Sequence, residues 1–222
     1  GLTSSGGSFQ LRGRGRAVEP SQHGETSMAK QCVPATPAPS DFGEHKVACN
    51  TTAGSFVITL EDSLSPLGVS RFLDLVDDSF FDDMILYRVI HGFLTQFGVA
   101  ADPKVQRKWD DRRFPDEPKK ASFQHGTVSY AGAGADSRSC HVFIAFGPNG
   151  RSLGGAPHET PLGRVTEGLE TLDRIQQNYK RAGYTDLTWL QGKIRTEGNR
   201  AAARYPLLDR IHHCRHASAG GG

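Results

Sequence analysis

The stretch "YRVIHGFLTQFG", residues 87–98, sets one arginine in an otherwise apolar run. Apolar and β-branched residues at this density predict strands over 84–90 and 93–97, joined at His91-Gly92. Side chains alternate along a strand, so two faces are predicted. One face carries Met84, Leu86, Arg88 and Ile90, and the other, directed into the core, carries Ile85, Tyr87 and Val89.

Arg88 is the informative residue of this stretch, because a charged group among apolar neighbours is rarely left without a partner or a task. One interpretation is structural: Arg88 extends to solvent or pairs with Asp82 or Asp83. Phe93 and Gln96 follow five and eight residues later. We therefore favour a binding surface.

A second strand predicted over "CHVFIAF", residues 140–146, adds to this surface, because His141 and Phe143 share a face. The amide of Gln96 both donates and accepts hydrogen bonds. An aromatic floor edged by an arginine and a glutamine suits an extended peptide. The alternative is that Phe143 only fills the core.

The remaining chain predicts a mainly β fold. Two apolar runs within 45–60 predict a hairpin around Gly54, and Ser65-Pro66 predicts a capped helix through about residue 80. Residues 98–125 are interpreted as loop. Further strands are predicted over 126–132, 161–165 and 207–214, and further helices over 166–177 and 196–206. Alternating βαβ units are absent, which favours a closed antiparallel β-barrel capped by two α-helices.

Composition narrows the function classes. The 222 residues suffice for one sizeable core, and 26 basic against 24 acidic residues give a net charge of +2 that does not favour nucleic acid as a partner. No run approaches the ~20 apolar residues of a transmembrane segment. Four cysteines without a C-x-x-C pair indicate no zinc ribbon and leave room for one disulfide that the sequence cannot pair.

Three motifs are interpreted as inert. Cys140-His141 are strand neighbours predicted to face opposite sides, which excludes a nucleophile and its base. "HHCRH", residues 212–216, matches no standard zinc spacing and is read as surface histidines. "AGAGADS" is followed by a strand rather than a helix, which disfavours a phosphate loop.

The two ends differ in composition from the middle. Residues 1–44 are rich in Gly, Ser and Pro and predict a disordered or extended arm, and residues 45–177 form the domain, followed by a C-terminal extension over 178–222. The first 18 residues hold three arginines and no acid, which is typical of plastid or mitochondrial targeting segments. We expect an organelle, with the cytoplasm as the alternative.

"FFDDMILYRVIHGFLTQFG", residues 80–98, resembles the signature of the cyclophilins, a family of peptidyl-prolyl cis-trans isomerases. "GTVSYAGAGADSRSCHVFIAF" and "SLGG…PLGRV" resemble its later motifs, so the resemblance spans Lys46 to Ile175. It implies a proline-containing peptide or protein as substrate, no metal and no cofactor. It implies Arg88 as the catalytic residue and, as substrate contacts, Phe93, Leu94, Gln96, Ala131, Ala133, His141, Phe143 and Leu153.

Several positions depart from the pattern of that family. Gly132 stands where many members have asparagine, His141 replaces glutamine, Gly154 replaces aspartate and Leu162 replaces phenylalanine. "RSLGGAPHETPLG" lacks a tryptophan that helps to hold cyclosporin, so weak binding of that ligand is expected. Two functions follow: a prolyl isomerase active in protein folding or assembly, or a catalytically weak assembly subunit of a larger complex, tethered through 1–44 and 178–222.

Overall fold

A computed structural model describes residues 44–146, 149–175, 185–186 and 188–217 of the chain. The predicted N-terminal arm, with its proposed targeting segment, falls on residues 1–43 and so lies outside the described residues. The described chain is built around one antiparallel sheet of ten strands in the order β3-β10-β1-β2-β8-β6-β7-β5-β4-β9. The strands are β1 (Glu44–Thr51), β2 (Gly54–Glu61), β3 (Met84–Ile85), β4 (Arg88–Ile90), β5 (Leu94–Phe97), β6 (Thr127–Tyr130), β7 (Val142–Ala145), β8 (Pro161–Glu167), β9 (Thr185–Asp186) and β10 (Arg210–His216).

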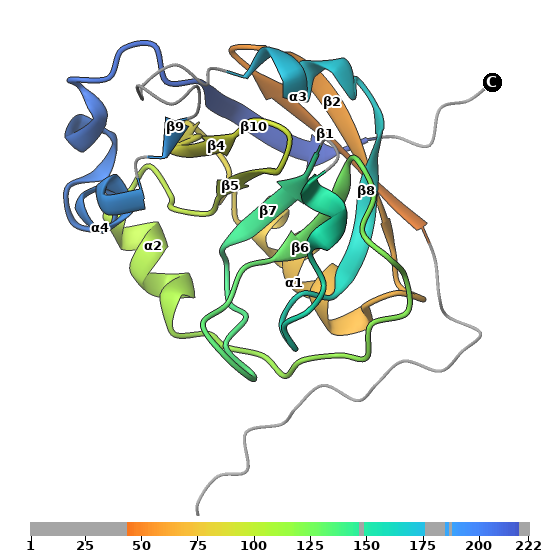
Figure 1. Cartoon of the computed structure of the whole chain (residues 1–222). Coiled ribbons are helices and arrows are strands. Elements are labelled where there is room, and N and C mark those ends of the chain that lie inside the picture. Colours follow the sequence, from red (N-terminus) through yellow and green to blue (C-terminus); the bar gives the residue numbers. More distant parts are fainter. Residues whose placement is uncertain (1–43, 147–148, 176–184, 187, 218–222) are drawn as a thin grey trace, which may run out of the picture. The chain divides into compact units, whose positions relative to one another are not determined.

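The sheet curls round on itself (Figure 1). β3 is one end of the strand order and β4 is next to the other end, yet only Leu86 and Tyr87 separate them in sequence. The predicted mainly β, antiparallel fold is confirmed. The predicted closure is not, because no backbone ladder joins β3 to β4 or to β9 among the described strands.

Four α-helices lie within the described residues, so a cap of two helices is an incomplete description. They are α1 (Pro66–Asp77), α2 (Pro103–Asp110), α3 (Glu170–Arg174) and α4 (Thr188–Glu197), with 3₁₀ turns η2 (Asn149–Ser152) and η3 (Gly198–Ala202). α2 lies in a segment predicted to be loop. The prediction of one helix over 196–206 is wrong. Helix α4 ends at Glu197, near the start of that range, and Gly198 has a φ of +69°, a conformation typical of glycines that end helices.

α1 covers the inner face of the sheet. Its buried residues include Val69, Phe72, Leu75 and Val76, which follow helical spacing and pack into the main core beside β2, β8 and β10. Pro66 occupies the first turn as predicted, but Ser65 makes no capping hydrogen bond to the helix backbone.

The N-terminus of α1 is capped from a distant loop instead. The carboxylate of Glu117 accepts hydrogen bonds from the backbone N–H of Leu67 (2.8 Å) and of Gly68 (3.1 Å). The same carboxylate forms an ion pair with Arg138, whose side chain is 0% exposed. A helix N-terminus attracts negative charge, so Glu117 replaces the predicted cap.

The strand predicted over 84–90 is interrupted at Leu86 and Tyr87, and the predicted alternation changes there. Met84, Leu86 and Val89 all belong to the main core, which corrects the prediction that Met84 and Leu86 share the face of Arg88. A smaller cluster lies under the C-terminal segment. It comprises Ile85, Tyr87, Val99, Leu190, Ile194, Ala202 and Leu208.

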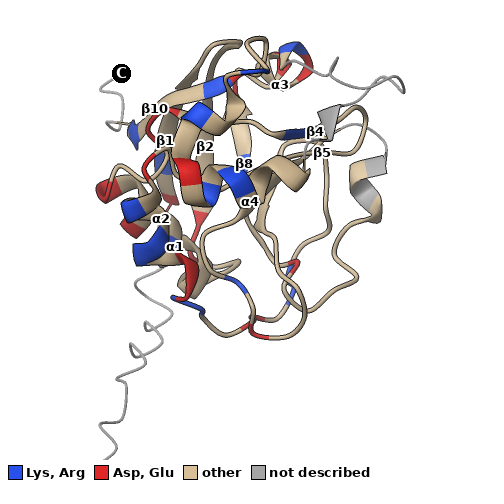
Figure 2. Ribbon diagram, turned by 90° about the vertical axis from the view of Figure 1, so that its left-hand side faces the viewer, with Lys and Arg blue, Asp and Glu red and all other residues tan. Residues whose placement is uncertain are grey.

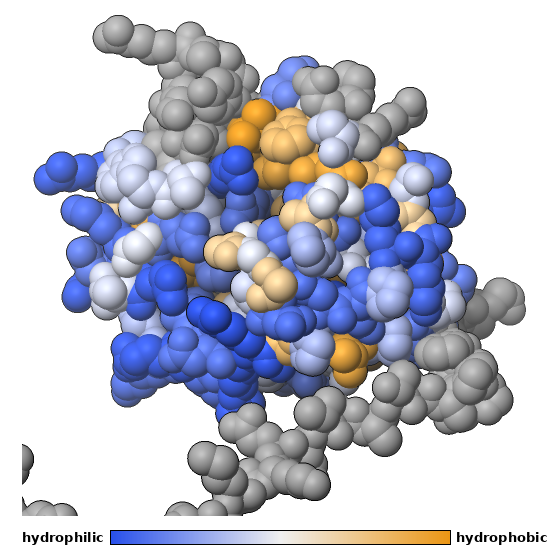
Figure 3. All heavy atoms as spheres, turned by 60° about the horizontal axis from the view of Figure 1, so that its bottom comes forward, coloured by the Kyte–Doolittle hydropathy of each residue, from blue (hydrophilic) through white to orange (hydrophobic). Residues whose placement is uncertain are grey.

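The segment from 178 onwards contributes two strands to the sheet, β9, which pairs with β4, and β10. β10 pairs with both β1 and β3. No described helix has the length and apolar character to cross a membrane. The face shown in Figure 3 is mostly hydrophilic, with a hydrophobic patch near its upper edge.

Cys49 of β1 and Cys214 of β10 lie opposite each other in register and form a disulfide that spans 165 positions of the sequence, while Cys140 is buried and free. Cross-links that close long loops restrict the unfolded chain strongly. We expect Cys49→Ala/Cys214→Ala to lower the free energy of unfolding by about 2–4 kcal/mol in urea denaturation. A reductant should destabilise the wild type and leave the double variant unchanged; equal sensitivity of the two would contradict the cross-link.

Candidate functional site

Arg88 and Gln96 face each other across neighbouring strands. They are register partners in the β4–β5 ladder, and Nη1 of Arg88 donates to Oε1 of Gln96 at 2.5 Å. The alternative partners predicted for Arg88 are engaged elsewhere, Asp82 with Arg215 and Asp83 with Arg210. Nε of the half-buried Arg88 is itself buried and has no partner among the described residues. Arg88 therefore holds a donor without an acceptor.

The register that pairs Arg88 with Gln96 continues across the next strand, β7, into the apolar part of the site. Gln96 is the register partner of Phe143, which in turn is the partner of Ser129. Directly opposite residues of an antiparallel sheet project to the same face. Arg88, Gln96 and Phe143 therefore lie side by side on one face, as the sequence predicted for its arginine, amide and aromatic floor.

An apolar cluster surrounds Phe143. Leu94, Phe123, Phe143 and Ala145 are buried, and Phe93, Ala131 and Leu153 pack against them half-buried. The structure thus brings together the aromatic and aliphatic residues predicted to line the site.

Phe123 was missed by the sequence analysis, because it lies in the predicted loop 98–125. Its ring is stacked on Phe143, with 5.8 Å between centroids and 13° between planes. Gly154 has a φ of +94°, and a Cβ there would lie 2.9 Å from the ring of Phe123. Glycine in place of the aspartate expected at 154 therefore fits the presence of Phe123.

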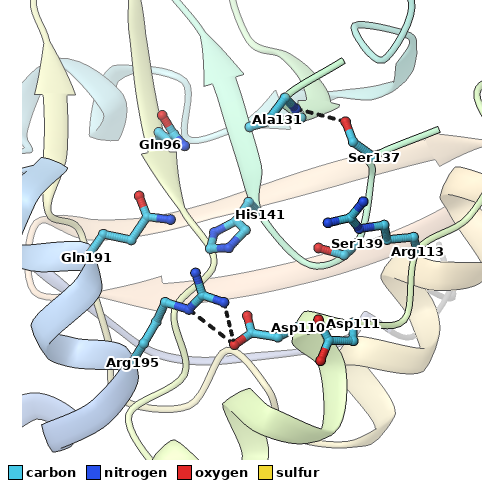
Figure 4. Close-up of a pocket in the computed structure, with 12 residues that line it drawn as sticks. Gln96, Asp110, Asp111, Arg113, Ala131, Ser137, Ser139, His141, Gln191 and Arg195 are labelled. Atoms are coloured by element: carbon cyan, nitrogen blue, oxygen red, sulfur yellow. Dashed lines mark hydrogen bonds and ion pairs between the residues drawn. The ribbon is translucent and has the colours of Figure 1, made fainter. Parts of the chain in front are cut away.

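A polar pocket of about 290 Å³ adjoins this cluster (Figure 4). Gln96, Ala131, Ala133 and His141 border it, as predicted for substrate contacts. Helix α4 adds Gln191 and Arg195, which sequence reasoning did not connect to the site. The other lining residues are Asp110, Asp111, Arg113, Gly132, Ser137 and Ser139.

The arrangement of Cys140 and His141 corrects the prediction that they point apart. Both precede β7, so strand alternation does not apply to them, and their ligand atoms lie within 4.8 Å of each other and of Asp110. Burial raises the pKa of Cys140 to about 11 and lowers that of His141 to about 4. Both groups are uncharged at neutral pH, the opposite of a thiolate activated by an imidazolium.

Asp110 is also engaged within the chain. Gln106 Nε2 donates to Oδ1 of Asp110 at 2.5 Å and to Sγ of Cys140 at 3.6 Å, and Arg195 Nη2 lies 2.8 Å from Oδ2. An amide and a guanidinium thus take the place that a cation would need. The geometry gives no support to a metal centre at these three residues.

The lowered pKa of His141 predicts a pH-dependent stability. The unfolded state gains a proton near the ordinary pKa of 6.5, whereas the folded state gains one only near 4, because burial opposes the charge. Stability should therefore fall as the pH falls from about 6.5 to about 4. We expect His141→Gln to lose less unfolding free energy than the wild type between pH 7 and pH 5 in urea titrations. Parallel losses in the two proteins would contradict this.

Gly132 leaves room for His158. A Cβ on Gly132 would lie 2.7 Å from Cγ of His158 and 2.6 Å from Oγ of Ser137, which is closer than packed atoms approach. We expect Gly132→Ala to lower the free energy of unfolding by about 1–3 kcal/mol, as overpacked positions do. Adding His158→Ala should restore part of the loss in thermal or urea unfolding; a further additive loss would show that the two residues do not compete for space.

Comparison with known proteins agrees with this geometry. Residues 46–196 match the sequence model of the family described as cyclophilin-type peptidyl-prolyl cis-trans isomerase. Peptidyl-prolyl cis-trans isomerase A of Dickeya dadantii is 29% identical over 138 residues, 59% of this chain and 70% of that protein. Peptidyl-prolyl cis-trans isomerase cypE of Dictyostelium discoideum is 28% identical over 139 residues, 60% of this chain and 85% of that protein.

A solved structure supports the fold independently. The cyclophilin-type peptidyl-prolyl cis-trans isomerase of Cryptosporidium parvum superposes with a TM-score of 0.57 at 20% identity, covering 80% of this chain and all of that one. The match over 46–196 spans more than half of the chain. The chain belongs to the cyclophilin-type peptidyl-prolyl cis-trans isomerase family.

Proposed function

We propose that this protein is a peptidyl-prolyl cis-trans isomerase whose catalytic residue is Arg88. Family membership supports the activity, and the pairing of Arg88 with Gln96 beside the Phe143 cluster supports the position of the site. The single observation that carries the assignment is Nε of Arg88 at the edge of that cluster, which has no partner in the part of the chain that the structure describes. A substrate that brings an acceptor to this place completes the hydrogen bonding of the arginine.

The chemistry needs only hydrogen bonding and shape. An X–Pro bond isomerises over a barrier of roughly 18–20 kcal/mol, because twisting removes amide resonance. The prolyl nitrogen regains its lone pair in the twisted state. A guanidinium that donates to this nitrogen stabilises the twisted state more than the planar one and so lowers the barrier.

The neighbouring groups have distinct parts in this proposal. Phe93, Leu94, Phe143 and Leu153 form an apolar receptacle for the pyrrolidine ring, with Phe123 beneath. Gln96 fixes Arg88 through Oε1, and its Nε2 is left to donate to a substrate carbonyl. Ala131, Ala133 and His141 border the path of the residues next to the proline.

The test is a proline-limited peptide assay with purified protein. Ala-Pro is a suitable core for the peptide, since the Cryptosporidium protein was also crystallised in the presence of that dipeptide. Faster cis-trans conversion that scales with protein concentration supports the proposal. A conversion rate equal to that of the peptide without protein would contradict the proposed isomerase activity and favour an assembly role without catalysis.

A further inference from the structure

Two helices beside the polar pocket carry a strong excess of positive charge. We define the α2–α4 face as residues 103–113 and 188–204, which include both helices and η3. Figure 2 shows blue segments along α2 and α4. Nine basic residues, Lys104, Arg107, Lys108, Arg112, Arg113, Lys193, Arg195, Arg200 and Arg204, stand against three acidic ones, Asp110, Asp111 and Glu197. The chain as a whole carries only +2, so positive charge is concentrated here.

Two of these cations pair with carboxylates. Lys108 binds Asp78 at 2.5 Å, and Arg195 binds Asp110, which is largely buried. Arg107 and Arg113 are exposed and form no ion pair with any described residue. The positive charge of the α2–α4 face is therefore mostly available to a ligand.

Of the two unpaired arginines, Arg113 lines the polar pocket itself and Arg107 lines a second cleft beside it. Figure 4 shows the guanidinium groups of Arg113 and Arg195 reaching toward the space near His141 from opposite sides of the polar pocket. A second cleft between α2 and α4 is lined by Arg107, Asp110, Gly192, Arg195 and Thr196. Arg195 borders both spaces, so they adjoin, and the first of them also contains Gln96 and Ala131.

We propose that the α2–α4 face recognises acidic residues of the substrate next to its proline, with Arg107 and Arg113 as the specificity-determining cations. This inference rests on the proposed function for its choice of substrate. Guanidinium groups bind carboxylates through paired hydrogen bonds, and complementary charge at the edge of a site raises affinity and association rate. An acidic peptide fits better than RNA, because the pocket beside these cations also contains Gln96 and Ala131 of the proposed proline site.

The experiment uses three fluorescent peptides with a central Ala-Pro: one with two glutamates before it, one with two glutamates after it, and one with glutamines at all four positions. Fluorescence anisotropy gives the affinity, and exchange NMR gives the catalysed rate. At low ionic strength we expect one of the glutamate peptides to bind about threefold to tenfold more tightly than the glutamine peptide. Raised salt should shrink the difference, since exposed charges are screened.

The double variant Arg107→Gln/Arg113→Gln should lose the preference for glutamate. The control variant Arg164→Gln, which replaces an exposed arginine on β8, should retain that preference. Equal affinity for all peptides, a preference that survives the double variant, or displacement of the peptide by a single-stranded RNA at lower concentration would overturn the inference. Anisotropy separates it from the proposed function: tight, glutamate-dependent binding without catalysis would refute the isomerase alone.

Discussion

Arg88→Ala lowers kcat/KM for an Ala-Pro peptide by about 10²–10³-fold, the loss seen when one donor to a developing charge is removed. The expected effect is large because Arg88 is the group that reaches the prolyl nitrogen in the proposed reaction. The apolar cluster of Phe143 should still bind the proline ring. Most of the loss should therefore appear in kcat rather than in KM.

Two further variants make this prediction specific. Arg88→Lys keeps the charge but replaces the planar fork of guanidinium donors by a compact ammonium on a flexible stem, so it should recover only a small part of the activity. Arg164→Ala removes an exposed arginine from β8 and should leave the activity unchanged. Matching unfolding curves would show that the folds are intact. Full activity of Arg88→Ala would exclude Arg88 as the catalytic residue.

Arg138→Met lowers the free energy of unfolding by about 3–5 kcal/mol, the cost of leaving a buried carboxylate unpaired. Arg138 is fully buried, and its guanidinium binds Glu117 at 3.1 Å and lies 3.4 Å from Asp116. It also stacks on Phe114, with 4.4 Å between the guanidinium carbon and the ring centroid. Without the Arg138 side chain, the buried carboxylate of Glu117, which caps α1, loses its cationic partner.

The double variant Glu117→Gln/Arg138→Met tests the pairing in urea denaturation. A glutamine keeps an acceptor for the N–H of Leu67 without a charge, so the double variant should be clearly more stable than Arg138→Met alone. Arg215→Met breaks an exposed pair with Asp82 and should cost less than about 1 kcal/mol. Similar losses for Arg138→Met and Arg215→Met would contradict the buried network.

The sheet could be predicted from the sequence and α2 could not. Strands β1, β2, β5, β6, β7 and β8 coincide with apolar runs, because burial fixes their alternation. In α2, "PKVQRKWD", only Gln106 and Trp109 are buried. A helix with so narrow a buried face has no apolar period to detect, and the start signal Asp102-Pro103 was interpreted as loop.

The C-terminal helix was misplaced for a related reason. Local composition favours a helix over the predicted range 196–206, because the alanines of 201–203 have high helix propensity. The structure places α4 before them, where Leu190 and Ile194 lie four residues apart and pack on the smaller core. Tertiary packing thus outweighed local propensity.

The residues of the site also fall into two groups, those that local sequence patterns predict and those that they do not. Arg88, Gln96 and Phe143 were found from strand alternation and from the family motif, because both depend on short sequence spacing. Gln191 and Arg195 reach the pocket from about a hundred residues away, and no local pattern links them to Gln96. Phe123 comes from a segment without periodicity. Such contacts depend on the path of the connecting loops, which local patterns do not determine.

Exchange NMR on an Ala-Pro peptide, with wild-type protein and Arg88→Ala side by side, tests the central claim most directly. It observes the cis and trans forms themselves and needs no coupled protease. We predict that substoichiometric wild-type protein accelerates exchange well beyond the rate of the free peptide and that Arg88→Ala restores nearly that slow rate. Equal acceleration by both proteins, or none by the wild type, would contradict the assignment of an isomerase centred on Arg88.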